Sequence, residues 1–135
     1  MRCPSCDVDM VVLEGEDQTL RKCSDCGGLW VDVSDLNRML LHHNLPGLES
    51  IGGKVDPDAM CGQCTDCLVD LVRVVTGDKS NPMSYDTCES CGGIFLEAEF
   101  TDATDATNYA GAKKEIIDFF TRWSSKGKKR VAAHG

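Results

Sequence analysis

The residues with the clearest capacity for chemistry in this chain are cysteines that occur in pairs separated by two residues. Two cysteines at this spacing can direct both sulfur atoms at one ion across a tight turn, and two such turns complete a tetrahedron. The paired cysteines are Cys3, Cys6, Cys23, Cys26, Cys64, Cys67, Cys88 and Cys91. The spacing therefore predicts two metal sites, each with four thiolate ligands.

A zinc ion held by four thiolates has no open coordination position, so it contributes folding energy and does not activate water. The sequence also contains no recognisable catalytic triad or phosphate-binding loop. We therefore expect two structural Zn²⁺ ions and a protein that is not an enzyme. Four thiolates suit iron as well, so a rubredoxin-like electron carrier is the alternative.

Disulfide bonds are a further interpretation of nine cysteines in 135 residues. A disulfide framework is typical of secreted chains, which enter the export pathway through an apolar leader. The N-terminus has no such stretch, and no apolar run in the sequence approaches the length of a membrane span. We therefore expect reduced thiols and a cytoplasmic protein.

The elements that must position these cysteines occur twice along the chain. The segment Cys-Gly-Gly-Leu-Trp-Val-Asp from Cys26 matches Cys-Gly-Gly-Ile-Phe-Leu-Glu from Cys91. Sixteen residues separate the first two cysteine pairs and twenty separate the last two, so the repeat keeps the ligand spacing while the loop between the pairs varies. Glycine after the second cysteine of a pair favours a backbone with positive φ.

Short strands are predicted between and after the cysteine pairs, where β-branched and apolar residues gather. The expected strands are residues 10–13, 19–22, 29–31, 68–75 and 94–96. After the first copy we expect a helix capped by Ser34, with Leu36, Met39, Leu40 and His43 on one face.

These elements predict a small metal-stabilised β fold of the zinc-ribbon or rubredoxin-like type, with two tandem ribbons and a C-terminal amphipathic helix. The first ribbon and its trailing helix would occupy residues 1–43, a linker residues 44–60, the second ribbon residues 61–100, the C-terminal helix residues 108–124, and a basic flexible tail residues 125–135. Apolar residues recur in that helix at steps of three and four. They are Tyr109, Ala112, Ile116, Phe119, Phe120 and Trp123.

The net charge of −8 disfavours nucleic acid as a partner, except through the basic C-terminal tail. Two zinc sites with four thiolates each would bring the charge to about −12. The apolar stripe of the C-terminal helix has two interpretations, packing into the core or self-association into a homo-oligomer.

Residues 2–40 resemble the transcription-factor-IIB-type zinc-ribbon family. The resemblance is carried by Cys3, Pro4, Cys6, Cys23, Cys26, Gly27, Gly28, Trp30, Asp32, Asp35 and Leu36. Residues 64–100 resemble it less closely, since Thr65 replaces the proline, Phe95 replaces the tryptophan, and Glu99-Phe100 sits one residue early. The resemblance implies a zinc-ribbon fold and bound zinc.

The expected function is that of an adapter that docks on a protein partner, with the transcription machinery suggested by analogy to the family. Asp25, Glu89, Trp30 and Phe95 lie beside the cysteine turns and are candidates for the docking surface. The alternative is that the two aromatic residues cover the metal. Cys61 is expected to be a spare thiol, with a ligand role as the alternative.

Overall fold

The computed structural model describes residues 1–15, 18–48, 50–59, 61–76, 83–97 and 108–132, with side chains as far as residue 123. The strands are β1 (Val11–Glu14), β2 (Thr19–Lys22), β3 (Leu29–Asp32), β4 (Lys54–Asp56), β5 (Gln63–Cys64), β6 (Val69–Asp70), β7 (Val72–Val75), β8 (Ser84–Thr87) and β9 (Gly93–Leu96). The helices are α1 (Val33–His42) and α2 (Tyr109–Ala132). The expected β fold with a C-terminal helix is confirmed.

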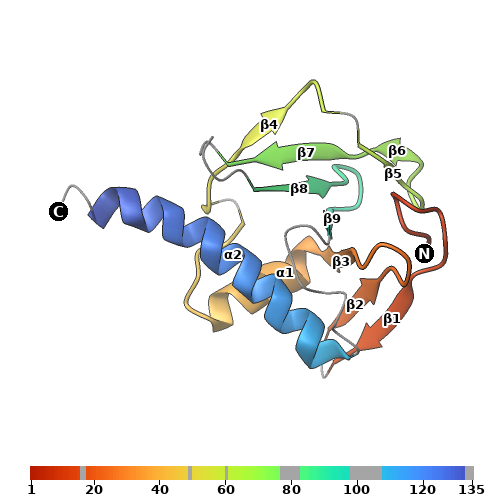
Figure 1. Ribbon diagram of the computed structural model, residues 1–135, viewed down its shortest axis with the longest axis horizontal. Helices are drawn as coiled ribbons and strands as arrows, with labels where there is room; N and C mark the ends of the chain where they lie inside the picture. The colour runs from red at the N-terminus through yellow and green to blue at the C-terminus, as the bar shows by residue number, and fades with distance from the viewer. Residues whose placement is uncertain (16–17, 49, 60, 77–82, 98–107, 133–135) are drawn as a thin grey trace.

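The two ribbons share one antiparallel sheet of seven strands, in the order β1-β2-β3-β9-β8-β7-β4 (Figure 1). Strands β1 to β3 belong to the first copy of the repeat, and strands β7 to β9 belong to the second. The central contact is made by β3 and β9, the last strand of each copy. The ribbons are therefore joined by backbone hydrogen bonds and do not sit side by side as separate modules.

The register between β3 and β9 has an internal symmetry. Trp30 lies opposite Phe95, which is the residue that occupies the same place in the other copy of the repeat. Leu29 lies opposite Leu96, and Val31 lies opposite Ile94. The pairing thus relates the two copies by an approximate twofold axis that passes between Trp30 and Phe95.

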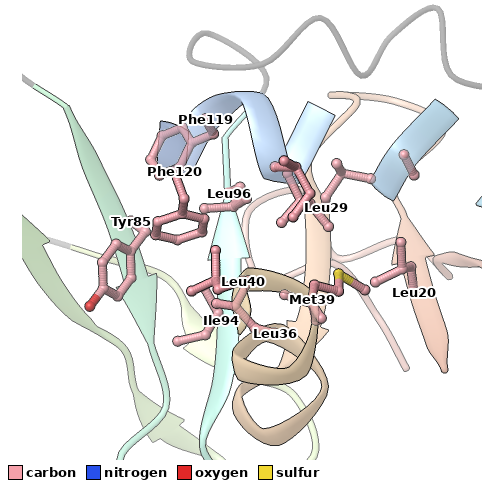
Figure 2. Close-up of a cluster of buried hydrophobic side chains, with 14 of the residues drawn as sticks. Leu20, Leu29, Leu36, Met39, Leu40, Tyr85, Ile94, Leu96, Phe119 and Phe120 are labelled. Atoms are coloured by element: carbon pink, nitrogen blue, oxygen red, sulfur yellow. The ribbon is translucent and has the colours of Figure 1, made fainter. Parts of the chain in front are cut away.

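Successive side chains of β3 and β9 point to opposite faces of the sheet. Leu29, Val31, Ile94 and Leu96 face the layer formed by α1 and α2 and join the larger apolar cluster (Figure 2). Trp30 and Phe95 belong instead to a second cluster on the other face, together with cysteines of both copies. The sheet thus has helices on one face and the cysteine clusters on the other.

The predicted helix after β3 is present as α1, but its cap differs from the one that we expected. The side chain of Asp32 accepts a hydrogen bond from the backbone amide of Ser34, so Asp32 is the N-cap and Ser34 lies in the first turn. Leu36, Met39 and Leu40 are buried as predicted. His43, which we expected on the same face as these three residues, is the C-cap and is exposed.

The structure adds detail to the predicted linker of residues 44–60. Within it, Lys54–Asp56 form β4, which pairs with β7 and completes one edge of the sheet. The proline and glycines around this strand are typical of a linker, so the sequence did not predict a strand here.

The C-terminal helix α2 lies across the helical face of the sheet (Figure 1). Its backbone continues to Ala132, well beyond residue 124, where we expected it to end. Ala112, Ile116, Phe119, Phe120 and Trp123 are all buried within the chain. Core packing therefore accounts for the apolar stripe that we also considered as a face for self-association.

Among the described residues, no helix is both long enough and apolar enough to cross a bilayer.

Candidate metal centres

The cysteine pairs lie on four tight turns that have closely similar backbones. Gly27 and Gly92 have φ of 76° and 79°, as predicted for the residue after the second cysteine. The matching positions in the opening turns hold Asp7 and Leu68, with φ of 57° and 59°. Asp accepts this left-handed conformation more readily than Leu does. Leu68 is therefore in an unfavourable backbone conformation.

The structure brings the eight paired cysteines together as two groups of four. In each group, one from each ribbon, the four sulfur atoms all lie within 4.8 Å of one another. The Sγ atoms of Cys3 and Cys26 are 3.8 Å apart, and those of Cys64 and Cys91 are 3.9 Å apart. A regular tetrahedron with Zn–S bonds of about 2.3 Å has edges of about 3.8 Å. The spacing of the thiols therefore fits a zinc ion in each group.

These separations exclude disulfide bonds, which need sulfur atoms about 2.05 Å apart. All nine cysteines of the chain are free. Soft thiolate sets of this kind select zinc or iron over magnesium or calcium. The two groups can therefore hold metal ions, as the sequence predicted.

Backbone amides surround the sulfur atoms and would stabilise them as thiolates. The amides of Ser5 and Cys6 lie 3.4 and 3.5 Å from Sγ of Cys3, and the amide of Gly28 lies 3.4 Å from Sγ of Cys26. In the second group the amide of Cys91 lies 3.4 Å from Sγ of Cys88. Such donors favour the charged form of sulfur, which is the form that binds metal.

The thiols of the second group differ in how readily they ionise. Burial acts to raise the pKa of Cys88, but hydrogen bonds from the amides of Cys91 and Ser90 and with the thiols of Cys91 and Cys64 together outweigh it, and the pKa falls to about 7. Burial raises the pKa of Cys91 to about 12, and hydrogen bonding to neighbouring thiols adds to the increase. A divalent ion that binds here at neutral pH must therefore displace protons.

The second glycine of each Cys-Gly-Gly segment lies beneath the aromatic side chain of the other ribbon. A Cβ atom at Gly93 would lie 1.9 Å from Cζ2 of Trp30, and one at Gly28 would lie 2.5 Å from Cζ of Phe95. Each aromatic ring therefore crosses the β3–β9 junction and packs on the neighbouring ribbon. Sequence reasoning missed this exchange, although the paired glycines were the visible sign of a close approach.

The aromatic residues that we considered for docking are buried. Trp30 is 5 % exposed and Phe95 is 2 % exposed, and both pack in one cluster with Cys3, Cys23, Cys64 and Cys88. The alternative interpretation, that they cover the metal centres, agrees with this placement. Asp25 and Glu89 are exposed beside the cysteine turns.

Cys61 lies outside both groups of four. Its thiol donates to Oδ1 of Asp86, with 3.6 Å between the sulfur and oxygen atoms. Asp86 is itself buried and accepts a hydrogen bond of 2.9 Å from Nε of Arg73. This arrangement matches a spare thiol in a polar cluster and gives no support to the ligand role.

Comparison with known proteins identifies the first ribbon. Residues 2–42 match the family described as transcription factor zinc-finger, the zinc ribbon of the transcription-factor-IIB type. This match confirms the predicted resemblance and extends it through α1. No curated protein and no solved structure matches the chain. The second group of four cysteines, in a ribbon with the same turns, indicates a second zinc ribbon.

Proposed function

We propose that this protein is a non-enzymatic adapter whose two zinc ions hold a rigid sheet in place for docking on a protein partner. The family match gives the first ribbon and implies zinc. Four thiolates in each group would occupy every position of a tetrahedral ion, which leaves none for a substrate or water. This closed donor set supports a structural use of the metal.

Leu68 is the observation that carries the docking proposal. Its side chain is 72 % exposed, and its φ of 59° is a conformation that costs a residue other than glycine about 1 kcal/mol or more. The matching residue in the first ribbon, Asp7, is polar and suits that conformation better. Leu68 is thus both apolar and exposed to water, and its backbone conformation is unfavourable. This combination supports a role for Leu68 in contact with a partner.

Val69 follows Leu68 and is also exposed, at 40 %. Together they give the opening turn of the second ribbon an apolar tip, next to the acidic residues Asp66 and Asp70. The partner that suits this tip is a protein with an apolar depression bordered by basic groups. Because the first ribbon belongs to a transcription factor zinc-finger family, a component of the transcription machinery is the first candidate.

The proposal is tested with the full, zinc-loaded chain as bait in extract from its native cells. We expect one partner to be retained by the wild-type protein and by Val55→Thr, a control in which another exposed valine is replaced on β4. Leu68→Asp copies the residue of the first ribbon, so it should remain folded and lose the partner. Retention of the same partner by Leu68→Asp would contradict docking through this tip.

The bound metal separates this proposal from the alternative of an electron carrier. We expect two equivalents of zinc and a colourless protein, in a compartment such as the cytoplasm where thiols remain reduced. A red protein with iron–thiolate absorption would favour the rubredoxin-like alternative.

A further inference from the structure

A cleft lies between α1 and α2, on the face of the molecule opposite the cysteine clusters. It has a volume of about 740 Å³ and lies between the C-terminal half of α1 and the N-terminal half of α2. The turn between β1 and β2 borders it at Gly15 and Gln18. Binding sites for small organic molecules have volumes of about 300–1,000 Å³. The cleft is therefore large enough for such a ligand.

One end of this cleft is fixed by direct contact between elements. A Cβ atom at Gly15 would lie 2.4 Å from Cε1 of Tyr109, so the β1–β2 turn and the first turn of α2 touch. The hydroxyl of Tyr109 donates a hydrogen bond to Oε1 of Gln18. Ile117 is buried and lines the cleft with Tyr109, which gives it an apolar part. The β1–β2 turn and the start of α2, which border the cleft, are thus held in place by packing within the folded chain.

The described residues that line the cleft carry an excess of positive charge, although the chain as a whole carries −8. Among the described residues that line it, Arg38, Lys113 and Lys114 supply three cations, and Asp118 supplies one carboxylate. His42 and His43 also line it, and both are exposed.

The cations differ in how far their charge is already neutralised. Arg38 is paired with Asp35, and Nζ of Lys114 lies 2.9 Å from Oδ2 of Asp118. Within the described part of the chain, the side chain of Lys113, in the second turn of α2, makes no ion pair or hydrogen bond. Lys113 therefore presents a positive charge to the cleft that no side chain of the described residues offsets.

We propose that this cleft binds a small organic anion, a phosphate or carboxylate group attached to an apolar body. The anionic group would contact Lys113 and Arg38, and the apolar body would lie along Ile117 and Tyr109. A nucleic acid fits less well, because a long polyanion extends beyond the cleft and is repelled by a chain with a net charge of −8. A ligand with one or two charges fits inside the cleft and experiences mainly the local excess of cations.

The test uses the full zinc-loaded protein, labelled for amide NMR, and three probes. Phenyl phosphate and benzoate carry the two anionic groups on an aromatic ring, and benzyl alcohol is their neutral counterpart. We expect saturable shifts from at least one anion, confined to the facing parts of α1 and α2. Benzyl alcohol should give none. Which of the two anions binds more tightly identifies the preferred group.

Lys113→Gln should weaken binding of the better anion about fivefold, as expected for the loss of one partly hydrated charge contact. Lys54→Gln is the matched control, because Lys54 is exposed on β4 and does not line the cleft. It removes the same charge and should leave the affinity within about twofold, since salt screens an exposed charge that does not contact the ligand. Equal weakening by both variants, shifts centred on the cysteine turns, or no saturable binding of either anion would overturn the proposal.

Discussion

Replacement of Gly93 by alanine tests whether the two ribbons are locked together through their aromatic side chains. The added Cβ would lie 1.9 Å from Cζ2 and 2.5 Å from Cε2 of Trp30. Carbon atoms in ordinary contact are about 3.5–4.0 Å apart, so one of the two groups must move by at least about 1.5 Å. Trp30 is almost fully buried among the cysteines and cannot rotate into solvent without exposing them.

The magnitude follows from two opposing effects. Overpacking of a core costs about 1–3 kcal/mol, and a site with so little room should lie near the upper limit. Alanine restricts the unfolded chain more than glycine does, which raises the free energy of unfolding by about 0.4–1 kcal/mol where the native backbone suits alanine. Gly93 is not among the residues with positive φ, so alanine suits its backbone. We expect a net loss of about 2 kcal/mol in the free energy of unfolding.

The assay is equilibrium unfolding in urea, followed by circular dichroism, at a fixed concentration of free zinc. Gly47→Ala is the control, because the nearest atom to its new Cβ would be Oδ1 of Asn37 at 3.6 Å, an ordinary contact. We expect that control to change stability by less than about 0.5 kcal/mol.

A double-mutant cycle with Trp30→Leu identifies the cause. If the indole is the obstacle, Gly93→Ala should cost much less in the Trp30→Leu background, with a coupling energy of at least about 1 kcal/mol. Additive effects, or a Gly93→Ala protein as stable as wild type, would refute the reasoning.

Three further variants or measurements address other parts of the structure. Cys88→Ser removes one ligand of the second group, so we expect the protein to retain one zinc ion instead of two. Because β9 pairs with β3, the amide NMR signals of β3 should also change. Unchanged signals in β3 would show that the ribbons fold independently. Leu68→Asp should raise the free energy of unfolding by up to about 1 kcal/mol by relieving the left-handed leucine, and a loss of stability in urea would argue against that strain. Burial and the nearby Asp86 carboxylate raise the pKa of Cys61 from 9.0 to about 11. In the zinc-loaded protein, Cys61 should therefore be alkylated about 100-fold more slowly at pH 8 than an ordinary thiol, and its rate should keep rising past pH 9. A plateau of the alkylation rate near pH 9 would contradict this burial.

The cysteine groups could be predicted from sequence because their geometry is local. A two-residue spacing determines how two sulfur atoms converge, and Gly27 and Gly92 mark where the backbone must turn. The strands of the first hairpin were predicted for the same reason, since alternation and β-branching are properties of a few neighbouring residues. In the second ribbon β8 was not predicted, and the expected strand at residues 68–75 is divided into β6 and β7, which belong to different sheets.

The union of the two ribbons depends on contacts that no local pattern reveals. Sixty residues separate the strands β3 and β9, and nothing in their sequences indicates that the last strand of one copy pairs with that of the other. The same limit applies to β4, a three-residue strand whose existence depends on the edge of β7. The N-cap was misplaced because Asp32 and Ser34 are both good capping residues, and the length of β3 decides between them.

The symmetry of the β3–β9 register gives the junction the character of a homodimer interface contained in one chain. Each copy presents the same strand to the other, which is the rule for contacts across a twofold axis between identical subunits. Because the chain connects the two halves, their association is intramolecular and does not depend on protein concentration. The arrangement also removes two strand edges that a lone ribbon would leave open to aggregation. Dilution should therefore leave this junction intact, whereas a junction between separate ribbons would come apart.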